Sequence, residues 1–198
     1  TKRFAIIETL LLDKLDDKIG ISFDKCLNSL ANFGIQITRI KSSIISDAMA
    51  LSSLVFSPEA YGTWKNVIEK DPTKMHPPVL ERFRSGQNIS GPDYVSAWQN
   101  LENLREKYIK LVSNFDAIFA PTTAILPPKI NTLLSDNAYF SERNLLTLRN
   151  TRVANLMGIP AITIPTNDNF CGFMIMGNPF QEKSLLNIGK NMEKILKN

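Results

Sequence analysis

The segment Leu145–Met176, LLTLRNTRVANLMGIPAITIPTNDNFCGFMIM, constrains the fold more than any other part of this chain. Its first half has helical character, and Gly158 suits the left-handed residue that commonly ends a helix. Pro160 then prevents the helix from continuing. Two short apolar runs on either side of an Asn-Asp-Asn turn predict a pair of strands. The segment therefore predicts a helix, a sharp stop, a strand, a turn and a second strand in immediate succession.

The N-terminal segment predicts a strand, a helix and another strand. Phe4–Ile7 is a short apolar run typical of a buried strand, and Ile35–Ile40 predicts a second strand. Between them, apolar residues recur at spacings of three and four, which places them on one face of a helix that Gly34 can end. These apolar residues are Ile19, Phe23, Cys26, Leu27, Leu30 and Phe33. The order predicts a βαβ unit with a right-handed crossover.

The middle of the chain alternates between helical and irregular character. Residues 43–70 are mostly helical in composition, and we expect a break at Pro58 and Gly62. Residues 71–91 contain several Pro and Gly residues and predict a surface loop with a short helix.

A long amphipathic helix is expected from Gly91-Pro92 to about Phe115, because Pro is favoured at the first helical position. A helix that begins near Pro179 is expected to close the chain, with Asn178 and Gln181 spaced like a capping box. The other expected elements are a strand at 116–120, a polar loop at 129–141, a helix at 141–157 and strands at 161–165 and 172–176. Together these elements predict one α/β domain over residues 1–198, with a mixed sheet covered by helices.

Composition and charge argue against several classes of protein. The chain has 198 residues, of which 43% are hydrophobic and 21% charged, as in ordinary globular domains. Its net charge of +4 comes from scattered residues rather than a basic stripe, so no nucleic-acid partner is expected. No apolar run approaches the ~20 residues that span a bilayer, so no membrane association is expected either.

The cysteine and histidine content indicates a reducing compartment and no metal. The two cysteines, Cys26 and Cys171, stand far apart in apolar surroundings and predict buried free thiols of a cytoplasmic protein. With His76 as its one histidine, the chain offers no common zinc set, and neither a metal nor any cofactor is expected. The chain opens at Thr1 without an initiator Met, which fits an engineered start, a processed product or a fragment alike.

Three segments, in the right order, resemble the C-terminal half of the amidase-signature amidohydrolases. The first is the strand and loop around Asp116, the second is the helix and its stop, and the third is the final strand and helix. The matching residues are Phe115–Thr123 (FDAIFAPTT), Arg149–Arg152 (RNTR) with Asn155–Ala161 (NLMGIPA), Gly172–Gly177 (GFMIMG) with Glu182 and Leu185-Leu186, and more loosely Arg82 with Gly86. The resemblance extends over the whole chain and implies the C-terminal half of an amidase-signature fold.

The resemblance also implies a chemistry whose central residues do not match this sequence. Members hydrolyse or transfer carboxylic amides through an acyl-enzyme, using a Ser nucleophile, a second Ser and a Lys base. Oxyanion donors come from a Gly- and Ser-rich segment. The Ser42-Ser43 and Ser52-Ser53 pairs have no flanking glycines, and His76 lies in a Pro-rich loop without a nucleophile motif. We therefore assign no catalytic residue to this chain.

Candidate substrate-binding residues are Arg82, Thr122 and Arg149. The loop after Pro121 and the helix carrying Arg149 and Asn150 are expected to form one wall of an acyl pocket, since sites in α/β sheets lie at the carboxyl ends of strands. Each of these residues also has a structural interpretation. Thr122 can satisfy local backbone groups, and at least one of Arg149 and Arg152 is expected in an ion pair or on a solvated face.

The function predicted from the sequence is the C-terminal part of an amidase, catalytically incomplete by itself. Its expected partners are a small amide substrate, the N-terminal catalytic portion and a second copy of the chain, because sheet edges and apolar faces cut from a larger fold tend to associate. Two alternatives remain. One is a non-catalytic binding or scaffold module, and the other is a split subunit, including a fragment of an amidotransferase A-type subunit.

Overall fold

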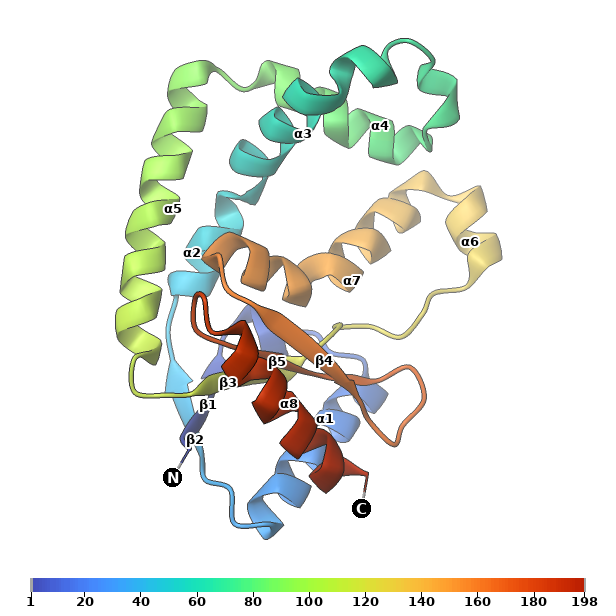
Figure 1. Ribbon diagram of the computed structural model, residues 1–198. Coiled ribbons are helices and arrows are strands. Elements are labelled where there is room, and N and C mark those ends of the chain that lie inside the picture. Colours follow the sequence, from blue (N-terminus) through green and yellow to red (C-terminus); the bar gives the residue numbers. More distant parts are fainter. Residues whose placement is uncertain (1, 198) are drawn as a thin grey trace.

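A five-stranded mixed sheet in the order β2-β1-β3-β5-β4 organises the molecule (Figure 1). The computed structural model describes residues 2–197; Thr1 and Asn198 lie outside the described part. The strands are β1 (Phe4–Glu8), β2 (Ile37–Lys41), β3 (Ala117–Pro121), β4 (Ala161–Pro165) and β5 (Gly172–Met176). The helices are η1 (Leu10–Leu12), α1 (Asp17–Asn32), α2 (Ile44–Ala50), α3 (Ser52–Ile68), η2 (Pro72–Lys74), α4 (Pro77–Arg84), η3 (Ser85–Asn88), α5 (Gly91–Val112), α6 (Ile130–Ser135), α7 (Asn137–Met157) and α8 (Glu182–Leu196).

The sheet is parallel on one side of β3 and antiparallel on the other. β1 pairs in parallel with both β2 and β3, while β5 runs antiparallel to both β3 and β4. Parallel strands are covered on both faces and are therefore apolar along their whole length. β3 follows this rule, because all five of its residues are buried. The expected mixed sheet covered by helices is confirmed, as are the parallel pairing of β1 with β2 and the bounds of β4 and β5.

Alternate side chains of the strands enter two separate cores. Phe4 and Ile6 of β1 pack under α1 and α8, whereas Ala5 and Ile7 pack under α2, α5 and α7. In the first core, the rings of Phe4 and Phe119 have centroids 4.9 Å apart, and Phe119 lies 4.9 Å from Phe173. The period of two along each strand thus produces a three-layer arrangement.

A helical lobe of α3, η2, α4 and η3 extends away from the sheet, at the top of Figure 1. The predicted break at Pro58 is wrong, because α3 continues through this residue and the helical path changes at Leu51 instead. A Cβ on Gly86 of η3 would overlap the carbonyl of Ser57, so only glycine permits this close approach. The packing of η3 against the turn of α3 at Ser57 therefore favours a continuous helix, although Pro58 by itself predicts a break. Residues 71–91 are also more helical than predicted.

Two further expectations about helix ends are wrong. The predicted polar loop at 129–141 contains α6 and the first turn of α7, whose Asp136 side chain accepts a hydrogen bond from the Tyr139 amide at 2.9 Å. The final helix begins at Glu182 rather than near Pro179. The side-chain amide of Asn178 donates to the carbonyl of Phe115 at 3.2 Å and does not cap the helix. By contrast, Gly158 ends α7 with φ 64°, as expected.

None of the described helices is both long and apolar enough to cross a membrane. The two cysteines are buried and free, as the sequence predicts. Burial, followed by the charges of Asp168 and Cys171, raises the pKa of the Cys26 thiol to about 11.

Cys26 should therefore react slowly with thiol reagents in the folded protein. At pH 8 its thiol stays protonated, whereas an exposed thiol reacts through its thiolate. We expect 5,5′-dithiobis(2-nitrobenzoate) to titrate both buried thiols only after guanidinium unfolding has exposed them to the reagent. Rapid reaction of both thiols in the folded protein, at the rate of an unfolded control, would contradict the buried placement.

Candidate functional site

The carboxyl ends of β1 and β3 form the edge of the sheet at which a site is expected. The loops that follow these two strands are tied to each other. The amide of Asp16 donates to the Ala124 carbonyl at 2.9 Å, and the Asp16 carboxylate accepts from the Leu126 amide at 2.8 Å. These two bonds hold the loop after Pro121 against the start of α1.

Asn150 of α7 joins the two strand ends from above. Its side chain is fully buried, at 0% exposure. Its Nδ2 donates to the carbonyl of Leu11 at 3.1 Å and to that of Pro121 at 2.8 Å. Its Oδ1 accepts from Nε of Arg149 at 3.1 Å. One amide therefore satisfies two buried carbonyls and positions the neighbouring guanidinium.

Thr122 lies where β3 meets the β4–β5 hairpin. Its amide donates to the carbonyl of Gly172 at 2.9 Å, and its hydroxyl bonds to that of Thr163 at 3.2 Å. A Cβ on Gly172 would lie 2.6 Å from the Thr122 hydroxyl, so the hairpin approaches as closely as glycine allows. These contacts support the structural interpretation of Thr122, which is nevertheless only partly buried and lies beside Pro121 at the expected edge.

Arg149 is partly buried and lacks a carboxylate partner within residues 2–197. Its Nη2 is buried without a hydrogen bond from the described part of the chain. Burial lowers the pKa of this guanidinium, and the charge of Asp13 opposes that shift. The sequence predicted an ion pair or a solvated face for at least one of Arg149 and Arg152. Neither residue forms an ion pair among the described residues, and both are partly buried.

Arg82 reaches the same helix from the lobe. Its Nη1 donates to Oδ1 of Asn144 on α7 at 2.7 Å. It also lies near enough to Arg152 for its charge to contribute to lowering the pKa of Arg152, after the larger effect of burial. The structure does not bring the three candidate residues together. Arg149 is on α7, Arg82 lies near Arg152 of the same helix, and Thr122 packs on the β4–β5 hairpin.

Arg152 was not selected from the sequence as a substrate-binding residue. With Phe56 of α3 and Leu148, Thr151 and Asn155 of α7, it lines a pocket of about 300 Å³. Asn155 is exposed at this pocket. Leu148, Arg152 and Asn155 are spaced by four and three residues, so the sequence could have predicted that they share one face of a helix.

The serines and His76 have structural surroundings. Ser42 accepts from the Ile44 amide at 3.2 Å, and Ser43 donates to Asp47 at 3.0 Å. His76 stands before α4 with its ring 4.4 Å from that of Phe140. No serine hydroxyl in the described part of the chain bonds to a lysine amine or to the His76 ring.

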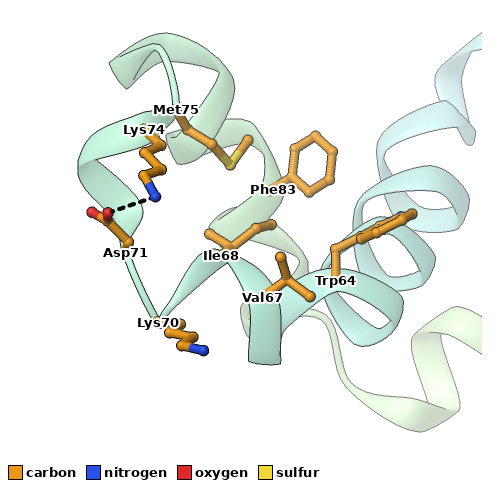
Figure 2. Close-up of a pocket in the computed structure, with 8 residues that line it drawn as sticks. All are labelled: Trp64, Val67, Ile68, Lys70, Asp71, Lys74, Met75 and Phe83. Carbon is orange, nitrogen blue, oxygen red and sulfur yellow. Dashed lines mark ion pairs between the residues drawn. The ribbon is translucent and has the colours of Figure 1, made fainter.

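A larger apolar pocket of about 660 Å³ lies in the lobe, where α3 ends and α4 begins (Figure 2). Trp64 and Val67 line it while remaining 54% and 64% exposed. Of its charged residues, Lys74 and Asp71 pair with each other at 3.3 Å. No group of three or more His, Cys, Asp or Glu side chains that could hold a metal was found in the described chain.

Replacement of Asn150 by Ala should destabilise the fold strongly. The change leaves the buried carbonyls of Leu11 and Pro121 without a donor, and each costs about 1–3 kcal/mol. We expect the free energy of unfolding in urea to fall by about 2–4 kcal/mol. Asn155→Ala, at an exposed position one and a half turns later, is the matched control and should change it by less than about 0.5 kcal/mol. Equal effects of the two variants would contradict the bridging role.

Comparison with known proteins agrees with this architecture. The Amidase family model matches residues 1–186. The A-type subunit of glutamyl-tRNA(Gln) amidotransferase from Sulfolobus acidocaldarius is 24% identical over 98% of this chain and 46% of its own length. The 2-amino-5-chloromuconic acid deaminase of Comamonas testosteroni is also 24% identical, over 93% of this chain and 41% of its own length.

Solved structures show the same fold. The allophanate hydrolase of Kluyveromyces lactis superimposes with a TM-score of 0.80 at 16% identity, over 98% of this chain and 32% of its own. The A-type subunit of the Thermotoga maritima glutamyl-tRNA(Gln) amidotransferase gives a TM-score of 0.71 at 21% identity, over 98% of this chain and 42% of its own. The chain therefore spans less than half the length of these relatives. The match of the family model over residues 1–186 shows that this chain belongs to the amidase family.

Proposed function

We propose that residues 1–198 form one domain, the C-terminal portion of an enzyme that hydrolyses carboxylic amide C–N bonds, and that this portion is catalytically incomplete by itself. The family match over residues 1–186 supports the reaction class. The observation that carries the proposal is the Asn150 bridge, which builds a polar wall at the carboxyl ends of β1 and β3. That wall lacks a serine activated by a base in the described part of the chain.

The chemistry assigns a limited role to this wall. Acyl transfer needs a nucleophilic hydroxyl, a base that takes its proton, and donors for the oxyanion. In this proposal the N-terminal catalytic portion supplies all three, and no catalytic residue comes from this chain. Arg82, Thr122 and Arg149 bind and orient the substrate in this proposal, because all three are partly buried polar groups. Thr122 and Arg149 lie at the wall, and Arg82 reaches α7 from the lobe. No cofactor takes part in this scheme, and the expected compartment is the cytoplasm.

A second candidate is a fragment of an amidotransferase A-type subunit. It is favoured by the likeness to the corresponding glutamyl-tRNA(Gln) amidotransferase subunits from several organisms. The two candidates share the amide-cleaving step and differ in the acceptor of the acyl or amino group. A non-catalytic scaffold module is the remaining alternative, and absence of activity in the complete protein would favour it.

The 198-residue chain alone should release no ammonia from small carboxylic amides, because it provides no activated nucleophile. The complete protein should release it, and Arg149→Met in that protein should lower kcat/KM by about 10- to 100-fold through loss of a substrate-orienting charge. Arg39→Met, at a surface ion pair with Glu8, is the control and should leave kcat/KM unchanged. Turnover by the isolated chain that disappears on substitution of one of its own serines would contradict the proposal.

We further propose that the isolated chain associates with a second copy through the free edge of β4. The edge strand exposes Ala161, Thr163 and Pro165, and unpaired edges recruit other strands. Light scattering should show a dimer, and Ala161→Lys should raise the dimer dissociation constant by about tenfold or more, since charge on an edge opposes pairing. A monomer at high concentration would contradict this expectation.

A further inference from the structure

Seven of the eight arginines of this protein fall into two groups, and the eighth, Arg3, is exposed. Four of them pair with glutamates: Arg39 with Glu8, Arg84 with Glu69, Arg105 with Glu102 and Arg143 with Glu142. Three others, Arg82, Arg149 and Arg152, are partly buried and have no carboxylate partner within residues 2–197. A charge removed from water without an opposite charge is unfavourable. The second group is therefore where an anion from outside the chain would be bound most favourably.

Arg152 is the member of this group that lines a pocket. Apart from a long contact of its Nη1 with Met49 Sδ at 4.0 Å, the described residues give its guanidinium no hydrogen-bond partner. Arg152 lines the pocket of about 300 Å³ between α3 and α7. Arginine remains protonated in proteins and presents a planar fork of donors that matches a carboxylate. The lining of this pocket therefore includes a charged arginine whose guanidinium is not used by a carboxylate of the described residues.

The other lining residues complement such a ligand. Asn155 lies three residues after Arg152, on the same face of α7, and its exposed side-chain amide can donate beside the guanidinium. The Thr151 hydroxyl already donates to the Leu148 carbonyl at 3.2 Å, so it contributes no donor to the ligand. Phe56 and Leu148 provide apolar walls. This combination fits an anionic head attached to a short apolar body.

Arg82 adds positive charge from the α4 side. It is held by Asn144, and its charge acts unfavourably on Arg152. An anion next to Arg152 would relieve this repulsion as well as the cost of burial. In Figure 1, α3 and α4 lie above α7, the helix that carries Arg152.

We propose that the pocket between α3 and α7 binds the carboxylate of a small organic acid, held by Arg152 and Asn155, and that the amide substrate of the complete enzyme carries such a carboxylate. The binding stands on the pocket alone, whereas its assignment to the substrate rests on the proposed function. The volume, near the lower end of the range for ligand sites, limits the occupant to a few carbon atoms.

Butyrate binding to the 198-residue chain tests the site directly. The chain is titrated at constant ionic strength, and the arginine Nε–Hε resonances are followed by NMR, with butyramide as the neutral ligand of the same shape. We expect a saturable shift of the Arg152 resonance with butyrate, with a dissociation constant on the order of 1 mM for so small a ligand. Butyramide should give no saturable shift in the same concentration range.

Variants separate recognition by Arg152 from general charge effects. Arg152→Gln should weaken butyrate binding by about tenfold or more, whereas Arg152→Lys should weaken it less, because it keeps the charge but loses the fork. Arg84→Gln removes the same charge from the ion pair with Glu69 and should leave binding unchanged. If Arg152→Gln does not fold, the wild-type resonance and the Lys variant still decide the result.

The outcomes are distinct. Equal shifts with butyrate, butyramide and chloride, or undiminished binding by Arg152→Gln, would overturn the proposal. The proposal would also be overturned if butyrate binds the 198-residue chain but not the complete protein. That result would indicate that an acidic side chain from the rest of the protein occupies the pocket. Saturable binding by both proteins supports the site even if no amide is hydrolysed. An active complete enzyme whose C-terminal chain binds no carboxylate would overturn this inference and leave the proposed function intact.

Discussion

The buried amide of Asn150 connects parts of the molecule that are far apart in sequence. It donates to the carbonyl of Leu11, just after β1, and to that of Pro121, at the end of β3, while it accepts from Arg149 on its own helix. Because a buried carbonyl without a donor is costly, the position of α7 above this edge of the sheet is narrowly set. Rotation or sliding of α7 would break both bonds. The location of every polar group on that helix follows from this constraint.

The position of α7 determines where unpaired positive charge lies in the molecule. With α7 fixed by Asn150, its face bearing Leu148, Arg152 and Asn155 turns toward the lobe rather than the sheet. Arg82 arrives from α4 on that side, so positive charge gathers without a carboxylate from the described chain. A stable domain seldom leaves guanidinium groups partly buried and unpaired without a ligand or a partner. The amidase fold thus presents a polar wall here, while the groups that cleave an amide are proposed to belong to the other portion.

The predictions that succeeded depend on local physics. The bounds of β4 and β5 and the end of α7 at Gly158 follow from apolar runs and from the left-handed conformation that glycine adopts easily. The predictions that failed involve contacts with distant residues. Pro58 stays inside α3 where Gly86 packs on Ser57, and Asn178 bonds to Phe115 rather than capping α8. A local signal cannot report a competing partner that is remote in sequence.

The sequence by itself determined the α/β class, the βαβ unit, the C-terminal strand pair and the family resemblance, because these depend on periodicity and on turn chemistry. It also singled out Arg82, Thr122 and Arg149, whose role in binding stays a prediction. Only the tertiary structure decided that Asn150 bridges two strand ends, that Thr122 packs on the hairpin, and that Arg82 meets Arg152. The physical reason is that pairing and burial of charges depend on which helices meet, and that choice is made by packing across the whole sheet.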